Sequence, residues 1–309
     1  MRQGLLWLSE RQGVFNFVRS NGIARRFASR FVAGESIDQG VEAARELSLR
    51  GITASLDLLG ESVTAEADAD AARDQYLRML DRMAASGAEV NVSVKLTQMG
   101  LDISEALCVA NMTAILERAA ALGGFVRLDM ESSAYTQRTL DFFRLRLFDR
   151  FGAQCGVVIQ AMLRRSEQDV EDLIAMKARV RLCKGAYLEP PAVAFAEKAD
   201  VDKSYVRLME RLLLAGNYPG IATHDEAIIT HARDFVRRQG IGTDRFEFQM
   251  LYGVRRDLQE GLRKAGYRLR VYIPFGTQWY PYLMRRLAER PANIAFFLGN
   301  IMRESVPGR

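Results

Sequence analysis

Two adjacent arginines, Arg285 and Arg286, are the residues of this sequence whose spacing most directly indicates a chemistry. They fall in WYPYLMRRLAER, a helical segment that follows an apolar strand ending at Gly276. Adjacent guanidinium groups repel each other, so the pair gains little from folding alone. Two planar forks can, however, hold one carboxylate from two directions, and Glu289 lies close enough along the helix to orient both. The pair therefore indicates a site for a small anion, although taken alone it also fits a solvated basic helix face.

Eight short apolar runs alternate along the chain with longer amphipathic stretches. Each run has the length of a strand, and its near-continuous apolarity is typical of strands that are covered on both faces. The runs begin at Ile52, Glu89, Phe125, Cys155, Arg179, Gly220, Phe246 and Arg268. This alternation predicts an α/β fold, a distorted (β/α)8 barrel of the TIM type. A doubly wound open sheet would need a glycine-rich phosphate turn after the first strand, and LDLLGESVTAE has no G-x-G-x-x-G pattern.

The first fifty residues precede the first predicted strand and have a helical pattern. We therefore expect an N-terminal helical extension over residues 1–50 and one catalytic barrel domain over residues 51–309. The opening segment mixes Trp7 and Phe15 with arginines and lacks the cleavage site of a signal peptide. Packing against the body of the protein is the interpretation we favour for it, and peripheral contact with the inner face of the cell membrane is the alternative.

The composition limits the class of protein. With 49% hydrophobic and 26% charged residues, the chain has the balance of an ordinary soluble globular protein. A formal net charge of +5 falls well short of the dense basic clusters of nucleic-acid-binding proteins, so we expect no nucleic-acid partner. Cys108, Cys155 and Cys183 are scattered, which argues against disulfides and favours a cytoplasmic location. His224 and His231 have no cluster of further ligands nearby, so we expect no metal site.

Polar residues recur at the carboxyl ends of the predicted strands, where the active site of such a barrel forms. A charged residue in an apolar strand is costly unless it is paired or binds a ligand, and recurrence on nearly every strand favours a ligand. These residues are Glu61, Lys95, Asp129, Glu131, Gln160, Arg181, Lys184, His224, Asp225, Gln249 and Tyr272. Because the set is rich in cations and has no nucleophile–base pair, it predicts an anionic ligand and a bound cofactor that carries the chemical step.

The segments that carry these residues resemble the proline dehydrogenases, and the small monofunctional bacterial form in particular. They are SVKL around Lys95, LDMES around Asp129, VVIQA around Gln160, VRLCKGAY around Arg181, ATHD around His224, FEFQMLYG around Gln249, and YIPFG followed by YLMRRLAE. The resemblance covers essentially the whole barrel. It implies oxidation of L-proline to Δ1-pyrroline-5-carboxylate as the first step of proline catabolism. Hydride would pass from proline C5 to N5 of a noncovalent FAD, and the electrons would pass on to a membrane quinone.

The resemblance also implies roles for particular residues. The implied cofactor contacts are Gln160, Arg181, Lys184, Gly185, Ala186, Lys198, Thr223, His224 and Gln249. The implied substrate contacts are Lys95, Ala186, Tyr187, Leu251, Tyr272, Tyr282, Arg285 and Arg286. The implied catalytic group is Lys95, Asp129, Arg181, Tyr272, Arg285 and Arg286. In this scheme Lys95 and the two arginines hold the substrate carboxylate, and Arg181 lies near the flavin N5.

Two further features concern the same site. Glu61, Arg285 and Glu289 form a hypothetical gate, in which Glu61 pairs with Arg285 in the empty site and releases it to the substrate. Leu188 stands where many members of the family have an aromatic side chain that stacks on adenine. The resemblance therefore supports the redox centre more strongly than the adenine contact.

Two other classes of function stay open at this level. In the first, Lys95 is the Schiff-base lysine of an aldolase-type lyase, which requires a depressed pKa of its ammonium group. In the second, the basic face and the N-terminal segment bind a membrane or a nucleic acid without catalysis, in a strongly salt-dependent way.

Overall fold

The computed structural model describes residues 29–289, except for the side chains of residues 285–289. Eight parallel strands form a closed barrel in which each strand pairs with its neighbour in sequence and β8 pairs with β1. The strands are β1 (Thr53–Leu58), β2 (Asn91–Val94), β3 (Phe125–Leu128), β4 (Cys155–Gln160), β5 (Arg179–Cys183), β6 (Gly220–Ala222), β7 (Glu247–Leu251) and β8 (Leu269–Phe275). The predicted (β/α)8 barrel is confirmed, and the open doubly wound sheet is excluded.

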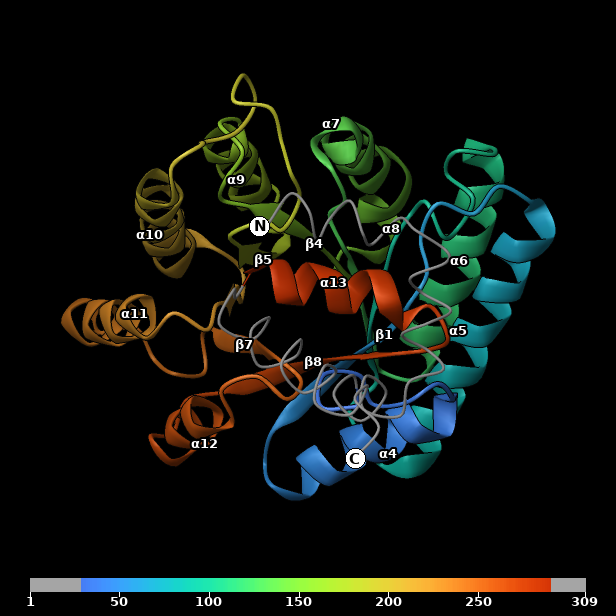
Figure 1. Cartoon of the computed structure of the whole chain (residues 1–309), viewed down its shortest axis with the longest axis horizontal. Helices are drawn as coiled ribbons and strands as arrows, with labels where there is room; N and C mark the ends of the chain where they lie inside the picture. Colours follow the sequence, from blue (N-terminus) through green and yellow to red (C-terminus); the bar gives the residue numbers. More distant parts are fainter. Residues whose placement is uncertain (1–28, 290–309) are drawn as a thin grey trace, which may run out of the picture.

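Helices alternate with the strands and surround them in a ring (Figure 1). They are α4 (Ile37–Leu49), α5 (Glu66–Ser86), α6 (Glu105–Ala121), α7 (Ser133–Phe142), the π-helix η1 (Phe143–Phe148), α8 (Asp149–Phe151), α9 (Ser166–Ala175), α10 (Lys198–Ala215), α11 (Glu226–Gln239), α12 (Arg256–Lys264) and α13 (Trp279–Glu289). The outer faces of the strands pack on the inner faces of these helices, with the exception of α13, and form one continuous apolar core.

Local sequence sets where the helices begin and end. Ser36 Oγ accepts a hydrogen bond from Gln39 N at 3.3 Å, and Gln39 Oε1 accepts one from Ser36 N at 3.1 Å, which is a capping box for α4. Asp225 caps α11, since its Oδ1 accepts from Ala227 N at 3.1 Å. Gly87 ends α5 with φ 77°, a left-handed conformation that suits glycine. The cap at Asp225 fixes one of the predicted site residues at the start of a helix.

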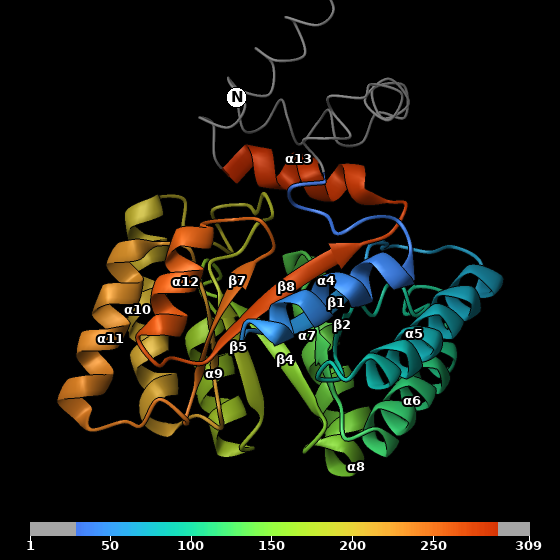
Figure 2. The same ribbon diagram turned by 90° about the horizontal axis from the view of Figure 1, so that it is seen from below.

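The barrel is distorted at its last helix. α13 does not pack on the outer wall but crosses the carboxyl end of the strands, where β8 points toward it (Figures 1 and 2). The outer position beside β1 and β8 is taken by α4, whose side chains Val41, Ala44 and Leu47 belong to the barrel core. Gly40 permits this close approach, because a Cβ there would lie 3.0 Å from the Phe275 ring. Because α4 takes this outer position, α13 lies over the carboxyl end of the strands. We call this end the mouth of the barrel.

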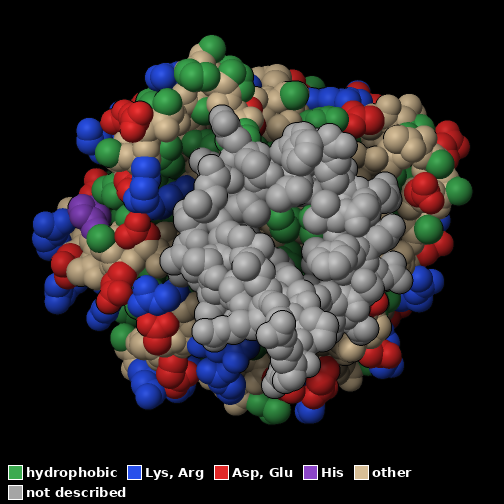
Figure 3. Space-filling model, in the orientation of Figure 1, with side chains coloured by type: hydrophobic (Ala, Val, Ile, Leu, Met, Phe, Trp, Pro, Cys, Tyr) green, Lys and Arg blue, Asp and Glu red, His purple; other side chains and the backbone are tan. Residues whose placement is uncertain are grey.

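Residues 1–28 lie outside the described residues, so the packing that we favour for the N-terminal segment, its alternative of membrane contact, and the helical extension over that range all stay predictions. Between residues 29 and 289, none of the helices combines the length and the apolarity needed to cross a bilayer. Around the rim of the face that carries α13, basic and acidic side chains are interspersed (Figure 3). The visible rim therefore presents no extended field of one sign.

Candidate active site

The inside of this barrel is polar, whereas branched apolar side chains usually fill barrels of this type. Alternate residues of a strand face the same side, so one inward position is followed by another two residues later. The buried polar residues of the strands are Ser55, Asp57, Asn91, Ser93, Arg127, Gln160, Arg181, Glu247, Gln249 and Arg270. Several are hydrogen-bonded between strands that are not neighbours, which places their side chains in the interior.

Arg181 is the centre of the network at the mouth, and only 6% of it is exposed. Its Nη1 donates to Asp129 Oδ1 at 2.8 Å and to Ser93 Oγ at 3.1 Å, and its Nε donates to Gln249 Oε1 at 2.5 Å. Tyr272 OH donates to the other oxygen of Asp129 at 2.7 Å. Side chains from several strands thus hold one guanidinium in a single orientation. Among the described residues, its Nη2 donates no hydrogen bond and stays available to a ligand.

Lys95 lies beside this network and is held by Asp57 of β1. Its Nζ is 3.3 Å from Asp57 Oδ1 and 3.5 Å from Oδ2, and both side chains are buried. Burial by itself lowers the pKa of Lys95, but attraction to Asp57 and Asp129 outweighs it, so the pKa of Lys95 is raised. A Schiff-base lysine needs the opposite shift, because its amine must lose the proton. The arrangement therefore favours an anion-binding Lys95 over the aldolase-type alternative.

Gln160, at the end of β4, offers a hydrogen-bond acceptor at the mouth. Its Nε2 donates to the backbone oxygen of Glu131 at 2.7 Å, which fixes the orientation of the amide. Within the described part of the chain its Oε1 accepts no hydrogen bond. The Glu131 carboxylate is bound by Thr97, whose Oγ1 donates to it at 2.6 Å, and burial raises the pKa of Glu131. Gln160 Oε1 and Arg181 Nη2 are thus an unused acceptor and an unused donor on neighbouring strands.

Two lysines and two aspartates form a cluster between the end of β5 and the helices α10 and α11. Lys184 Nζ donates to Asp202 Oδ1 at 2.5 Å and to Asp225 Oδ2 at 2.9 Å. Burial acts to raise the pKa of both aspartates, and Lys184 overcomes it, so both pKa values are lowered. Lys198 also pairs with Asp202, and its side chain is 77% exposed. Lys198 can therefore turn toward an anion without leaving a buried position.

The loop after β5 places the backbone of Gly185, which carries no side chain, at the mouth of the barrel. Gly185 adopts φ 105°, and a Cβ there would lie 2.5 Å from Met162 Sδ, so glycine is required. Ala186 and Tyr187 follow and are partly buried. Leu188 is 51% exposed, at the position where the resemblance leads one to expect an aromatic ring.

Thr223 and His224 follow β6 and are tied to the neighbouring elements. Leu251 N donates to His224 Nε2 at 2.8 Å, so this ring nitrogen carries no proton. Thr223 Oγ1 accepts from the backbone N of Asp225 at 3.1 Å. His231 instead lies on α11, with its Nε2 2.6 Å from an oxygen of Glu210, so the two histidines belong to different sites. Between residues 29 and 289, no group of three or more metal-binding side chains is gathered.

The predicted carboxylate clamp and gate lie largely outside the described side chains. Arg285, Arg286 and Glu289 belong to α13, but their side chains are not described. Tyr282 of the same helix is buried. Glu61 follows β1, and its charge acts on the pKa values of Lys95 and Glu131, so it lies near the site. The clamp and the gate stay predictions, although their helix crosses the mouth.

Sequence reasoning missed several interior residues that hold this network, among them Asp57, Ser93 and Glu247. Asp57 stands in LDL and Glu247 in FEF, each an acidic residue between apolar neighbours. A charged residue within an apolar strand is the signal that identified Lys95, and it would also have identified Asp57 and Glu247. Ser93 carries no such signal, because a buried serine in a strand is common.

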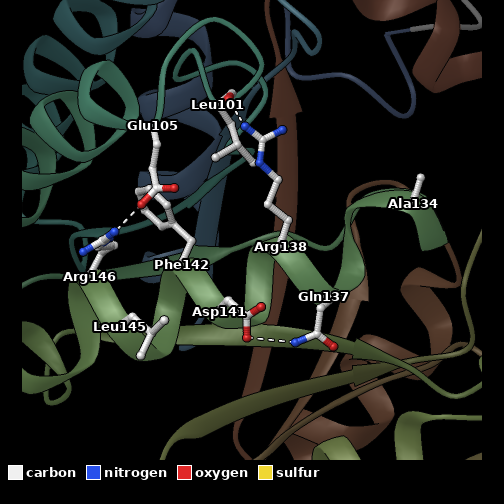
Figure 4. A pocket seen from close by; sticks show the side chains of 9 residues that line it. All are labelled: Leu101, Glu105, Ala134, Gln137, Arg138, Asp141, Phe142, Leu145 and Arg146. Carbon is white, nitrogen blue, oxygen red and sulfur yellow. Dashed lines mark hydrogen bonds and ion pairs between the residues drawn. The ribbon is translucent and has the colours of Figure 1, made fainter.

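A second hollow lies outside the barrel, between α6 and the α7–η1 segment, with a volume of about 370 Å³ (Figure 4). Its polar side chains bind one another. Arg138 Nη1 donates to Asp102 Oδ1 at 2.8 Å, its Nη2 donates to the backbone oxygen of Leu101, and Arg146 Nε donates to Glu105 Oε1 at 2.7 Å. None of the predicted site residues lines this outer cavity. The mouth of the barrel is therefore the candidate active site.

Comparison with known proteins identifies the family of this chain. The sequence model of the proline dehydrogenase family matches residues 40–297. Proline dehydrogenase of Deinococcus radiodurans is 43% identical over 306 residues, which cover 98% of this chain and 98% of that protein. Proline dehydrogenase 1 of Bacillus subtilis is 39% identical over 306 residues, which cover 98% of this chain and 100% of that protein.

Solved structures show the same fold within longer chains. Proline utilization A from Bdellovibrio bacteriovorus, inactivated by N-propargylglycine, superposes with a TM-score of 0.79 at 26% identity. The match covers 90% of this chain and 34% of that chain, so this chain spans about a third of its length. The relatives of similar length are the monofunctional enzymes. This chain belongs to the proline dehydrogenase family and is an oxidoreductase.

Proposed function

We propose that this chain oxidises L-proline to Δ1-pyrroline-5-carboxylate with noncovalent FAD and passes the electrons to a membrane quinone. The observation that carries the proposal is the fixed guanidinium of Arg181. Within the part of the chain that the structure describes, its Nη2 donates no hydrogen bond and Gln160 Oε1 on the neighbouring strand accepts none. Family membership supports the class of reaction, and these two residues support a planar polar cofactor at the mouth.

The residues at the ends of β4 to β7 fit FAD. An isoalloxazine ring has donors and acceptors along its polar edge, which Gln160 and Arg181 complement. Gly185 lets backbone approach a ligand closely, and the exposed Lys198 can reach a phosphate. The remaining predicted cofactor contacts are Lys184, Ala186, Thr223, His224 and Gln249. When bound, FAD supplies the hydride acceptor at its N5.

The chain itself binds and orients the substrate. The raised pKa of Lys95 keeps its ammonium group charged, so it can bind the carboxylate of proline. Arg285 and Arg286 are proposed to complete this clamp from α13. Asp129 fixes Tyr272 through the 2.7 Å hydrogen bond, and Tyr272 forms part of the wall over the pyrrolidine ring. The remaining proposed wall residues are Ala186, Tyr187, Leu251 and Tyr282. A clamp at one end and a wall over the ring hold C5 in a reactive orientation.

Arg181 contributes by electrostatics rather than by proton transfer. Its guanidinium is held rigidly before any reaction, so it stabilises negative charge that develops beside it without reorganising. A general base is not required, because the neutral amine of proline can bind from solution. The chain is thus proposed to position charges and to leave the redox chemistry to the cofactor.

Glu61, Arg285 and Glu289 are proposed to gate the site. Glu61 lies near Lys95, and in this scheme it holds Arg285 until the substrate carboxylate arrives. Glu61→Ala should then change the KM for L-proline and the mobility of α13. A variant in which neither changes would remove the gate from the scheme.

The colour of the purified protein tests the proposal. The protein should be yellow, and L-proline should bleach its flavin absorbance under anaerobic conditions, with recovery on adding a soluble quinone. A colourless protein that takes up no added FAD would overturn the cofactor. A yellow protein that L-proline does not bleach would overturn the substrate, and reduced flavin that no quinone reoxidises would overturn the acceptor.

A further inference from the structure

We propose that Glu247 is a positioning residue, which fixes the amide of Gln249 and through it the guanidinium of Arg181. The inference rests on the proposed function, in which Arg181 lies at the reaction centre. Glu247 lies deeper in the barrel than the mouth, is 2% exposed, and has no part in the scheme above.

Glu247 and Gln249 are two residues apart on β7, so both side chains point into the barrel. Gln249 Nε2 donates to Glu247 Oε1 at 2.6 Å, and Gln249 Oε1 accepts from Arg181 Nε at 2.5 Å. The two ends of an amide have nearly the same shape but opposite hydrogen-bonding character. An ionised carboxylate only accepts, so Glu247 forces the NH2 group toward itself and the oxygen toward Arg181. The carboxylate therefore selects the one amide orientation that Arg181 can use.

Hydrogen bonds from Arg270 and Tyr218 keep the Glu247 carboxylate ionised and fixed in position. Arg270 donates to it through Nε at 2.7 Å and Nη2 at 3.1 Å, and Tyr218 OH donates to Oε2 at 3.2 Å. Burial acts to raise the pKa of Glu247, and Arg270 overcomes it, so the pKa is lowered. Arg270 also binds Glu89 at 2.9 Å, and that side chain is 46% exposed. A chain of charge-assisted hydrogen bonds thus runs from the lower barrel to Arg181.

Gly220 on β6 provides a second, independent observation. It pairs in register with Glu247, and a Cβ at residue 220 would lie 2.4 Å from Gln249 Nε2. Any side chain there would push on the amide that Glu247 orients. The neighbouring strand thus leaves the space that the amide group needs in this orientation.

We call the hydrogen bonds from Gln249 to Glu247 and from Arg181 to Gln249 the lock. Without the lock, the hydrogen bonds of Arg181 would lie along one edge only, and its Cζ would keep the contact with the Tyr272 ring, whose centroid is 5.2 Å away. Asp129 and Ser93 both accept from Nη1, so they leave the guanidinium free to tilt about that atom. The bond from Nε to Gln249 removes this freedom and thereby sets the direction of the unused Nη2. The lock acts on the orientation of Arg181 and not on its charge.

The test compares Glu247→Gln with Glu89→Gln in the purified holo-protein. Each removes one carboxylate from Arg270, but only the first removes the carboxylate that accepts from the NH2 group of Gln249. The Nε–H resonance of Arg181, identified by its loss in Arg181→Lys, should shift and broaden in Glu247→Gln and stay unchanged in Glu89→Gln. We also expect kcat for L-proline to fall about tenfold in Glu247→Gln with little change in KM, the scale of one hydrogen bond.

A rescue variant separates positioning from general damage. In the double variant Glu247→Gln with Gln249→Glu, the carboxylate at 249 accepts from Arg181 in either orientation, and the amide at 247 donates to it. The Nε–H resonance of Arg181 should then return to its original position. Should Glu247→Gln fold poorly, Gly220→Ala displaces the same amide while it keeps every charge, and should move the same resonance.

The outcomes for the two proposals differ. An unchanged Arg181 resonance in both Glu247→Gln and Gly220→Ala would overturn the lock. A shifted resonance with unchanged kcat and flavin spectrum would support the lock and overturn the role of Arg181 in the proposed function.

Discussion

The barrel mouth and the outer cavity both contain arginines, but these arginines differ in the hydrogen-bond donors that they keep available for a ligand. In the outer cavity the Arg138 side chain is 45% exposed and spends its donors on Asp102 and Leu101. At the mouth the Arg181 side chain is 7% exposed and is fixed by several strands, and its Nη2 donates no hydrogen bond to the described residues. A count of cations would not have identified which of the two regions binds a ligand. In this protein, the ligand site is recognised by buried, rigidly held side chains that still have a hydrogen-bond donor or acceptor available for a ligand.

The two regions also differ in energetic terms. An exposed ion pair contributes about 0–1 kcal/mol, because water competes for both partners. Breaking a buried pair is much more costly, because it leaves a charge without water or a counterion. Substitutions at the mouth should therefore affect both stability and activity, and equivalent substitutions in the outer cavity should affect neither strongly.

The largest effect is expected from Lys95→Met, which leaves Asp57 buried without its cation. Breaking such a pair should lower the free energy of unfolding by about 3–5 kcal/mol. The KM for L-proline should rise about 10- to 100-fold, because a charged hydrogen bond to the carboxylate is lost. Chemical denaturation and steady-state kinetics measure the two effects separately.

A double variant distinguishes these two roles of Lys95. Lys95→Met with Asp57→Asn removes both charges, so most of the lost stability should return while KM stays high. A double variant as unstable as Lys95→Met would contradict the pairing with Asp57. A normal KM in either variant would contradict the role of Lys95 in binding the carboxylate.

Tyr272→Phe should have a smaller effect, because it removes one hydrogen bond and keeps the ring. The bond from Tyr272 OH to Asp129 is 2.7 Å long, and its loss should lower kcat/KM about 10-fold. Tyr205→Phe is the matched control, since its buried hydroxyl donates to Leu182 O at 3.2 Å away from the mouth. Both should lose similar stability, and only Tyr272→Phe should lose activity. An equal loss of activity in Tyr272→Phe and Tyr205→Phe would contradict a specific role of the Tyr272–Asp129 hydrogen bond in catalysis.

Most of the fold could be predicted from the sequence, and the reason is visible in the strands. Strands buried on both faces, such as CGVVIQ of β4, have continuous apolar runs that differ clearly from the amphipathic helices. The position of α13 over the mouth could not be predicted from its sequence. An apolar helix face looks alike in sequence whether it packs on the wall or over the mouth, and α4 and α13 both have such a face.

The candidate site could be predicted in part. Lys95, Asp129 and Arg181 stand out because charge at the end of an apolar strand needs a partner or a ligand. Which residues meet inside the barrel depends on the stagger of the strands, and the sequence does not contain that stagger in readable form. The bond between Arg181 and Ser93, 88 residues apart, therefore became visible only in the structure.

The smallest effect is expected from Arg138→Ala in the outer cavity. Its ion pair with Asp102 is exposed, so the free energy of unfolding should change by no more than about 1 kcal/mol. The value of kcat/KM should stay within about twofold, because the described hydrogen bonds of Arg138 go to Asp102 and to the backbone of Leu101, neither of which is a predicted site residue. Arg146→Ala, which breaks the pair with Glu105, should behave alike. A loss of activity as large as that of Tyr272→Phe would mean that the outer cavity and the barrel mouth are coupled. The hydrogen-bond donors left available in each region would then not be enough to identify the active site.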